Sequence, residues 1–431
     1  MATFSISEIT PQRLKTWGTR SIFSLSDQVL TSGSSFVLNV ILARWLTQDA
    51  YGAFALAFSA FLFLSGFHNV LVIEPMTVIG PSNYPQRFIE YFSAQLRLHI
   101  VLSSFLSGVI LFVGGILIVR NFQDSLVGVV LAGGISVPFL LLLLLARRMC
   151  YTVQKPLLAV QGSAPYFVLL LGGAFELHEI GWLNGTTAFL WMACVSLVVS
   201  LFILNRVGVS YESISQRASF RTKPLLKENW GYSRWLTLTT ALSWVTMQVQ
   251  AFLAAGFLGL GAAGILRAMQ LPSLAMTQLI TATLLIVLPS LSMDLGNGNL
   301  SLLRKKAAIA AGLLVTLATL FVLFLYLFSG PLERWMFGGK YAAFAWLMPV
   351  LGLVPVFTAL SGSFSLALRI FRKSHFELLA YILSSATALG LSFALIPRWG
   401  LRGAAASAVC SVAVLSIAVL ISYLKWGMID A

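Results

Sequence analysis

Hydrophobic residues fall into twelve stretches separated by short polar loops. Each stretch is roughly 20 residues long, the length that an α-helix needs to cross a hydrocarbon core of about 30 Å. Within lipid every backbone amide must be satisfied inside its own segment, so the pattern predicts helices. The chain is therefore expected to be an all-α polytopic membrane protein. The stretches lie near 22–43, 51–73, 98–119, 126–146, 157–176, 185–204, 235–256, 267–289, 307–329, 343–367, 375–396 and 403–424.

Basic residues are distributed unevenly between the alternate loops. With the N-terminus in the cytoplasm, 21 of the 28 Lys and Arg residues lie on the cytoplasmic side. The outer side keeps Arg44, Arg120, Arg267, Arg334, Lys340, Arg398 and Arg402. Short cytoplasmic loops carry an excess of Lys and Arg in membrane proteins. The pattern predicts a cytoplasmic location for both termini.

The longest polar segment, 205–234, divides the twelve stretches into two sets of six. We expect an N-terminal lobe over 1–204, a cytoplasmic linker over 205–234 and a C-terminal lobe over 235–431. A shift of 212 residues pairs Ala43 with Ala255 and Gly52 with Gly264, which suggests two related halves. Parallel repeats of this kind build transporters that bind substrate near the membrane midplane.

Composition removes several classes of function. The net charge of +14 is spread over many cytoplasmic loops, so no compact basic domain for nucleic acid is present, and anionic membrane lipids are the expected electrostatic partners. No HExxH, Walker lysine or nucleophile-elbow motif occurs, so we do not expect an enzyme. The four histidines lack metal-ligand spacing. Gly259–Gly264 fits G-x-G-x-x-G but joins two membrane stretches, where a tight turn is the simpler explanation.

Polar residues at membrane depth are the strongest site candidates, because such groups are costly in lipid. Asp27 and Asn39 share one helical stripe in the first stretch with Thr31 and Ser34 or Ser35, and Gln28 follows Asp27. The stripe either lines a water-filled cavity, with Asp27 binding a proton, a cation or the substrate, or Asp27 pairs with a basic residue such as Arg20 or Arg234. Both interpretations stay open.

Further candidates lie on other stretches. Gln248 belongs either to a second cavity wall or to helix packing. Arg267 either reaches an anionic group in a cavity or snorkels to the outer interface.

Three features lie at the predicted cytoplasmic ends of helices. Arg147 and Arg148 suit a diphosphate, although they also satisfy the positive-inside rule. Glu74 is a candidate gate, and Pro75 next to it most simply marks the end of a helix.

Two segments carry a recognisable pattern of short motifs. The first hairpin carries Ser26-Asp27-Gln28, Ser32-Gly33-Ser34, Phe36, Leu42-Ala43-Arg44 and Tyr51-Gly52, and the last turn runs from Pro397 to Ala405. Together they resemble Wzx-type polysaccharide flippases. The same superfamily contains the MATE drug exporters and the lipid II flippases. Lipid II flippases usually have fourteen helices rather than twelve, which favours the Wzx type.

The resemblance implies two six-helix bundles and alternating access in the bacterial inner membrane. It implies flipping of undecaprenyl-diphosphate-linked oligosaccharide toward the periplasm, with the polysaccharide polymerase and chain-length machinery as partners. Coupling to H⁺ or Na⁺ stays open, and no other cofactor is expected. The cationic cavity that such flippases use is expected to draw on Arg44, Arg147, Arg148, Arg234 and Arg267.

Two other functions compete with the flippase. A cation-coupled MATE-type exporter should carry acidic residues deep in a lobe, whereas Asp27 and Glu176 both lie near helix ends. A membrane glycosyltransferase or polymerase should carry a large outer loop with catalytic groups, and the short predicted loops disfavour it.

Overall fold

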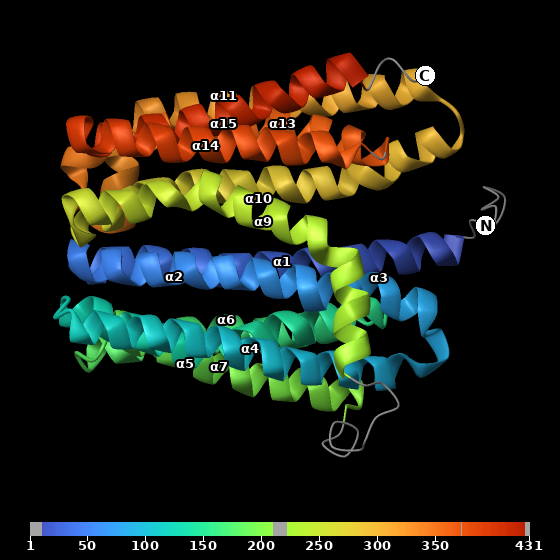
Figure 1. The fold of residues 1–431 in the computed structure, drawn as a ribbon, viewed down its shortest axis with the longest axis horizontal. Helices are drawn as coiled ribbons and strands as arrows, with labels where there is room; N and C mark the ends of the chain where they lie inside the picture. Colours follow the sequence, from blue (N-terminus) through green and yellow to red (C-terminus); the bar gives the residue numbers. More distant parts are fainter. Residues whose placement is uncertain (1–10, 210–221, 372, 427–431) are drawn as a thin grey trace. The chain divides into compact units, whose positions relative to one another are not determined.

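The computed structural model describes residues 11–209, 222–371 and 373–426, and every regular element in these ranges is helical (Figure 1). The α-helices are α1 (Pro11–Trp45), α2 (Gln48–His68), α3 (Glu74–Asn83), α4 (Phe88–Val119), α5 (Asp124–Thr152), α6 (Pro156–Glu179), α7 (Gly185–Val207), α9 (Thr222–Leu258), α10 (Leu260–Gly296), α11 (Leu300–Phe337), α12 (Leu347–Leu351), α13 (Leu353–Ile370), α14 (Ser374–Trp399) and α15 (Leu401–Trp426). Three short elements join them: a π-helix η2 (Asn69–Ile73) and 3₁₀ turns η3 (Pro85–Arg87) and η4 (Ala342–Phe344).

The predicted multi-pass membrane architecture is confirmed. Eleven helical segments in the described ranges are long and apolar enough to cross a membrane. The first predicted stretch, 22–43, lies within α1. Several helices extend beyond the apolar stretches, and α11 spans 38 residues where the hydropathy predicts 307–329. Hydropathy locates the part of a helix that lies in lipid, and polar turns continue the helix beyond it.

One predicted helix end is wrong. Pro75 does not end a helix, because α2 continues through η2 into α3 as far as Asn83. The predicted linker 205–234 contains the first part of α9, which begins at Thr222 and runs without interruption to Leu258. Residues 210–221 of that linker lie outside the described residues. Arg234 therefore lies on a helix.

The chain forms two compact units whose boundaries cross α1, α2 and α9. Unit 1 contains the described residues up to Leu38 together with Leu64–Trp235, and unit 2 contains Asn39–Phe63 and the residues from Leu236 onward. In unit 1, α5 packs against α4, α6 and α7. In unit 2, α13 packs against α10, α11 and α15, and α14 packs against α15. The division into two six-helix lobes, 1–204 and 235–431, stays a prediction.

The core of unit 2 follows helical periodicity. Met276, Ile280 and Leu284 recur every four residues on α10 and are buried against α11 and α13. This spacing places them on one face of the helix. The interior of the unit is therefore a conventional helix–helix core, and its buried polar groups stand out against it.

Candidate functional site

Asp27 forms a buried ion pair in unit 1. Its side chain on α1 is fully buried, and Arg147 of α5 binds both carboxylate oxygens, with Nε 3.2 Å from Oδ1 and Nη2 2.6 Å from Oδ2. The hydroxyls of Tyr151 and Ser163 also donate to the carboxylate. A bidentate Arg–carboxylate pair with further donors offsets the desolvation of both charges. The cluster fixes α1 against α5 and α6.

Arg147 was not one of the partners proposed from the sequence, and the side chain of Arg20, one of those proposed, lies outside the described residues. Arg234 is exposed and lies over the ring of Trp235, with 5.7 Å from the guanidinium carbon to the ring centroid. Arg148 is exposed on the turn beside Arg147. Gln28 is exposed as well and donates to Ser32 at 3.0 Å. The structure brings Asp27 and Arg147 together and leaves Gln28, Arg148 and Arg234 exposed.

Arg267 is buried in unit 2. The residue lies on α10 and is 6% exposed, so its side chain does not snorkel to an interface. Its guanidinium lies next to the hydroxyl of Tyr51 on α2, and its Nε has no hydrogen-bond partner. Within the described residues no ion pair involves Arg267. A guanidinium carries five N–H donors, so this group retains capacity for an acceptor.

Two further candidates lie along the helices of the same unit. The Tyr51 hydroxyl donates to Asn39 Oδ1 at 3.4 Å, which connects α1 to the Arg267 group. Gln248 of α9 accepts a hydrogen bond from Ser59 of α2 at 3.1 Å. Asn39 therefore lies in the Arg267 network, and Gln248 serves the packing of α9 against α2. A role of either side chain in substrate binding stays a prediction.

Arg44 lies at the C-terminal end of α1. Here Arg44 and Lys340 each bind backbone carbonyls at the C-terminal end of a helix. Arg44 Nη1 donates to the Trp335 carbonyl in the last turn of α11 at 3.2 Å. Lys340 donates to the carbonyls of Ala43, Arg44 and Leu46, at 3.2 and 2.6 Å for the first two. Cations stabilise these orphan carbonyls at the negative end of the helix dipole. Burial lowers the pKa of Lys340 below its usual range. Both residues act as caps here.

Pro75 explains the π-helix η2. The Glu74 N–H bonds the Asn69 carbonyl five residues earlier, and Pro75 has no N–H to continue either register. The carbonyls of Val70 and Leu71 are therefore left without the donor that residue 75 would supply.

Side chains from α9 take the place of that donor. Ser233 Oγ donates to Val70 O at 2.5 Å, and Asn229 Nδ2 donates to Leu71 O at 2.8 Å. Asn229 is held in turn by Gln95 of α4, with Gln95 Nε2 3.3 Å from Asn229 Oδ1. The break in α2 is built into the packing of unit 1. Glu74 accepts from Asn69 at 3.2 Å, and its role as a gate stays a prediction.

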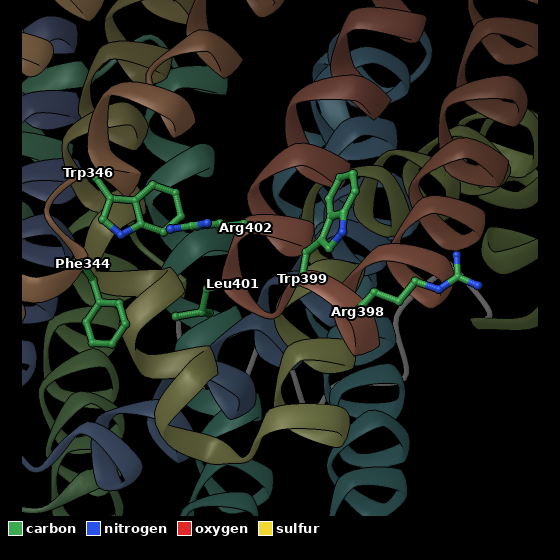
Figure 2. A pocket seen from close by; sticks show the side chains of 6 residues that line it. All are labelled: Phe344, Trp346, Arg398, Trp399, Leu401 and Arg402. Carbon is green, nitrogen blue, oxygen red and sulfur yellow. The ribbon is translucent and has the colours of Figure 1, made fainter.

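A hollow of about 630 Å³ opens in unit 2 beside the turn between α14 and α15. Figure 2 shows its lining, with Arg402 directed toward Trp346 and Arg398 pointing away from it. The Arg402 guanidinium carbon lies 5.6 Å from the centroid of the Trp346 ring. Tryptophans are enriched at both membrane–water interfaces. The two tryptophans are therefore consistent with an interfacial position for this end of the helices, on either side of the membrane.

Two groups of buried side chains were not predicted from the sequence. His68 and His99 are buried in unit 1 with their rings in contact, although 31 residues separate them. Asn229 and Ser233 reach the broken helix from the segment that had been predicted as a linker. Proline at membrane depth was a usable signal for the break, but its polar partners carry no mark in the sequence. Within the described ranges, no group of three potential metal ligands gathers.

Comparison with solved structures gives the same fold over nearly the whole chain. An inward-facing multidrug resistance MATE family transporter of the MOP superfamily aligns with a TM-score of 0.77, covering 94% of this chain and 97% of that one. The fold is that of the MATE transporters. The eukaryotic MATE transporter AtDTX14 aligns with a TM-score of 0.67 over 95% of this chain and 96% of its own.

A flippase shares the fold as well. The lipid II flippase MurJ, in an inward closed conformation, aligns with a TM-score of 0.70 over 94% of this chain and 87% of its own. The three sequences are 13%, 15% and 14% identical to this chain in the order given, so the likeness is one of fold. By sequence, the chain matches no protein-family model and no curated protein.

Proposed function

We propose that the chain is a flippase that moves undecaprenyl-diphosphate-linked oligosaccharides from the cytoplasmic to the periplasmic leaflet of the bacterial inner membrane. Both termini face the cytoplasm in this proposal, and the polysaccharide polymerase and chain-length machinery receive the product. Transport proceeds by alternating access, with H⁺ or Na⁺ as the candidate coupling ion.

The proposal rests on one observation: among the described residues, each buried carboxylate has a hydrogen-bond donor, whereas the buried guanidinium of Arg267 has no carboxylate partner. The buried carboxylates of the described chain each have a donor: Asp27 binds Arg147, Asp294 binds Lys306 at 3.0 Å, Glu377 binds Arg369 at 2.6 Å, and Glu333 accepts from the Tyr341 N–H at 2.8 Å. Arg267 is equally buried and has no carboxylate. A buried charge without a counter-ion is costly, so its retention favours an anionic ligand.

A diphosphate suits such a guanidinium, because the planar fork binds phosphate oxygens with paired N–H donors. Arg267 is the first phosphate contact in this proposal, with Asn39 and Tyr51 beside it. The guanidinium is covered in this conformation, so substrate reaches it in another state of the cycle. Arg44, Arg148 and Arg234 are exposed and are proposed as contacts on the path of the headgroup.

A cation-coupled exporter of drugs or small molecules is the second candidate, favoured by the MATE fold itself. A cationic drug requires a buried carboxylate that is free to bind it. The pairing of Asp27 with Arg147 removes the carboxylate that the sequence offered for that role. Release of Asp27 from Arg147 in another conformation would be needed for export.

Ligand binding by the purified full-length chain in nanodiscs tests the proposal. The ligands are an undecaprenyl-diphosphate-linked oligosaccharide and, separately, a lipophilic cationic dye. We expect the glycolipid to bind and Arg267→Gln to weaken its binding by about tenfold or more, as the loss of a charged hydrogen bond does. Arg120→Gln, an exposed arginine at the end of α4, is the matched control. Binding of the dye alone would reject the flippase in favour of the exporter.

A further inference from the structure

Two histidines form a buried pair beside the π-helix. His68 is the last residue of α2 and His99 lies on α4, and their side chains are 0% and 3% exposed. His68 Nε2 lies 2.9 Å from His99 Nδ1, and the rings meet edge to face with centroids 5.0 Å apart. At this distance one nitrogen donates an N–H and the other accepts it.

Within the described residues, no carboxylate forms an ion pair with either histidine. His99 is the ionisable group that acts on His68. Ionisable groups on the surrounding elements have partners of their own: Glu74 bonds Asn69, Tyr91 bonds Gln95, Arg147 and Tyr151 bond Asp27, and Glu228 bonds Tyr84. Arg97 precedes His99 by two residues on α4 and therefore projects from a different side of that helix. An added charge on the pair would face no counter-ion.

The unpartnered atom lies on His68. Its Nδ1 is buried and has no hydrogen-bond partner. When His68 Nε2 donates to His99 Nδ1, the His68 Nδ1 of the neutral pair is a bare acceptor, which is a modest cost. Addition of one proton to the pair turns both nitrogens of one ring into donors, and an unmatched buried donor next to a new charge is a large cost. Loading the pair therefore favours a conformation that supplies an acceptor or water to His68.

The neighbouring backbone is held partly by side chains. His68 directly precedes η2, whose Val70 and Leu71 carbonyls are held by Ser233 and Asn229 rather than by the helix ladder. Side-chain bonds of this kind can exchange for other donors without breaking a helical turn. The π-helix is therefore the neighbouring segment whose hydrogen bonds a change at His68 would alter first.

We infer that His68 and His99 form a binding site for a single proton, and that loading this site changes the register of the π-helix in α2. A proton from water adds to an imidazole lone pair, no covalent bond is broken, and the pair gains one positive charge. In the proposed transport cycle, on which this step rests, the proton would bias α2 between these two registers. The site supplies a concrete residue assignment for coupling to H⁺.

Histidine NMR on the full-length chain tests the site without any substrate. The chain has four histidines, so ¹⁵N-imidazole labelling gives few signals, and His→Gln variants assign them. We expect His68 and His99 to shift together, with uptake of one proton, as the pH is lowered through and below the ordinary imidazole range near about 6.5. Four independent titrations, or no uptake by the pair down to about pH 4, would overturn the inference.

Hydrogen exchange supplies the second readout. After correction for the intrinsic pH dependence of amide exchange, we expect the amides of residues 69–74 and 76 to be severalfold less protected at acidic than at neutral pH in the wild type. This difference in protection should vanish in His68→Gln and His99→Gln, and His178→Gln and His375→Gln should retain it. Protection that is independent of pH in the wild type would reject the link to the π-helix. If the protein flips glycolipid but His68 and His99 take up no proton, this inference alone is rejected. If the two histidines take up a proton but the protein moves no glycolipid, the proposed function alone is rejected.

Discussion

Gly52 and Gly264 contact each other at the point where α2 and α10 cross in unit 2. A Cβ atom on Gly52 would lie 1.9 Å from the Leu260 carbonyl oxygen and 3.1 Å from Gly264 N, and one on Gly264 would lie 3.2 Å from Gly52 Cα. These are the positions that the 212-residue shift makes equivalent. Equivalent residues of two repeats meet where an axis relating the two hairpins passes between them, so the contact supports the internal repeat.

Alanine at Gly52 should destabilise the protein, because backbone atoms of Leu260 cannot move aside as a side chain could. We expect a loss of about 1–3 kcal/mol or more, measured as a lower midpoint in thermal unfolding of the detergent-solubilised protein. Gly312→Ala is the matched control, since a Cβ there meets nothing within 4 Å and the helix gains propensity. Equal midpoints for the two variants would show that α2 and α10 do not cross this closely.

Breaking the Asp27–Arg147 pair should act first on stability. Because the pair is buried, removal of one partner leaves the other charge uncompensated, at a cost of about 3–5 kcal/mol. We expect Asp27→Asn and Arg147→Met each to lower the unfolding midpoint.

The double variant separates structure from transport. Asp27→Asn with Arg147→Met should recover much of the lost stability, because no unpaired charge remains. Arg148→Met, an exposed neighbour, is the control. A recovered fold that no longer transports would place the pair in the mechanism. Additive losses in the double variant would contradict the ion pair.

The effects on stability of substitutions at Ser233 and Pro75 should not be additive, because both residues determine how the carbonyl of Val70 is satisfied. Ser233→Ala leaves the Val70 carbonyl without its donor, which costs about 1–3 kcal/mol. Pro75→Ala restores a backbone N–H to the helix ladder, so Ser233→Ala should cost less in that background. A double-mutant cycle by thermal unfolding measures the difference. Ser422→Ala, whose hydroxyl bonds its own helix at Ala418, should show no coupling to Pro75.

Lys340 should stabilise the end of α1. Its ammonium bonds three carbonyls of the last turn, and Lys340→Met removes these donors while keeping the apolar stem. We expect a loss of about 1 kcal/mol, seen as a lower unfolding midpoint and as earlier hydrogen exchange near Trp45. Lys305→Met, an exposed lysine near the start of α11, provides the comparison. A loss of the same size in both variants would mean that charge alone, and not capping, is responsible.

The membrane fold was predictable because hydropathy reports burial in lipid directly. The apolar stretches located the membrane part of nearly every helix, and the glycine at position 52 was matched to its partner at 264 before any contact was known. Helix ends were less predictable, because polar turns such as Thr222–Arg234 continue a helix without an apolar signal. Pro75 was read as a helix end, whereas side chains from α9 allow the chain to continue.

The polar interior was predictable as residue types but not as partners. Asp27 and Arg147 were both candidates, yet 120 residues separate them and their pairing follows from the packing of α1 on α5. Arg267 was left open between an interface and a buried role, because its position near a helix start fits either. The pairing of His68 with His99 was not predictable, because the histidines were searched only for the short spacings of metal ligands. Such spacings do not reveal a contact between two helices.

A deletion strain of the host bacterium tests the central claim most directly, with lipid-linked glycans and surface polysaccharide quantified together. The account predicts accumulation of undecaprenyl-diphosphate-linked repeat units and loss of the surface glycan, both reversed by the wild-type gene and not by Arg267→Gln. Unchanged glycans, together with raised sensitivity to cationic drugs, would contradict the flippase and identify an exporter.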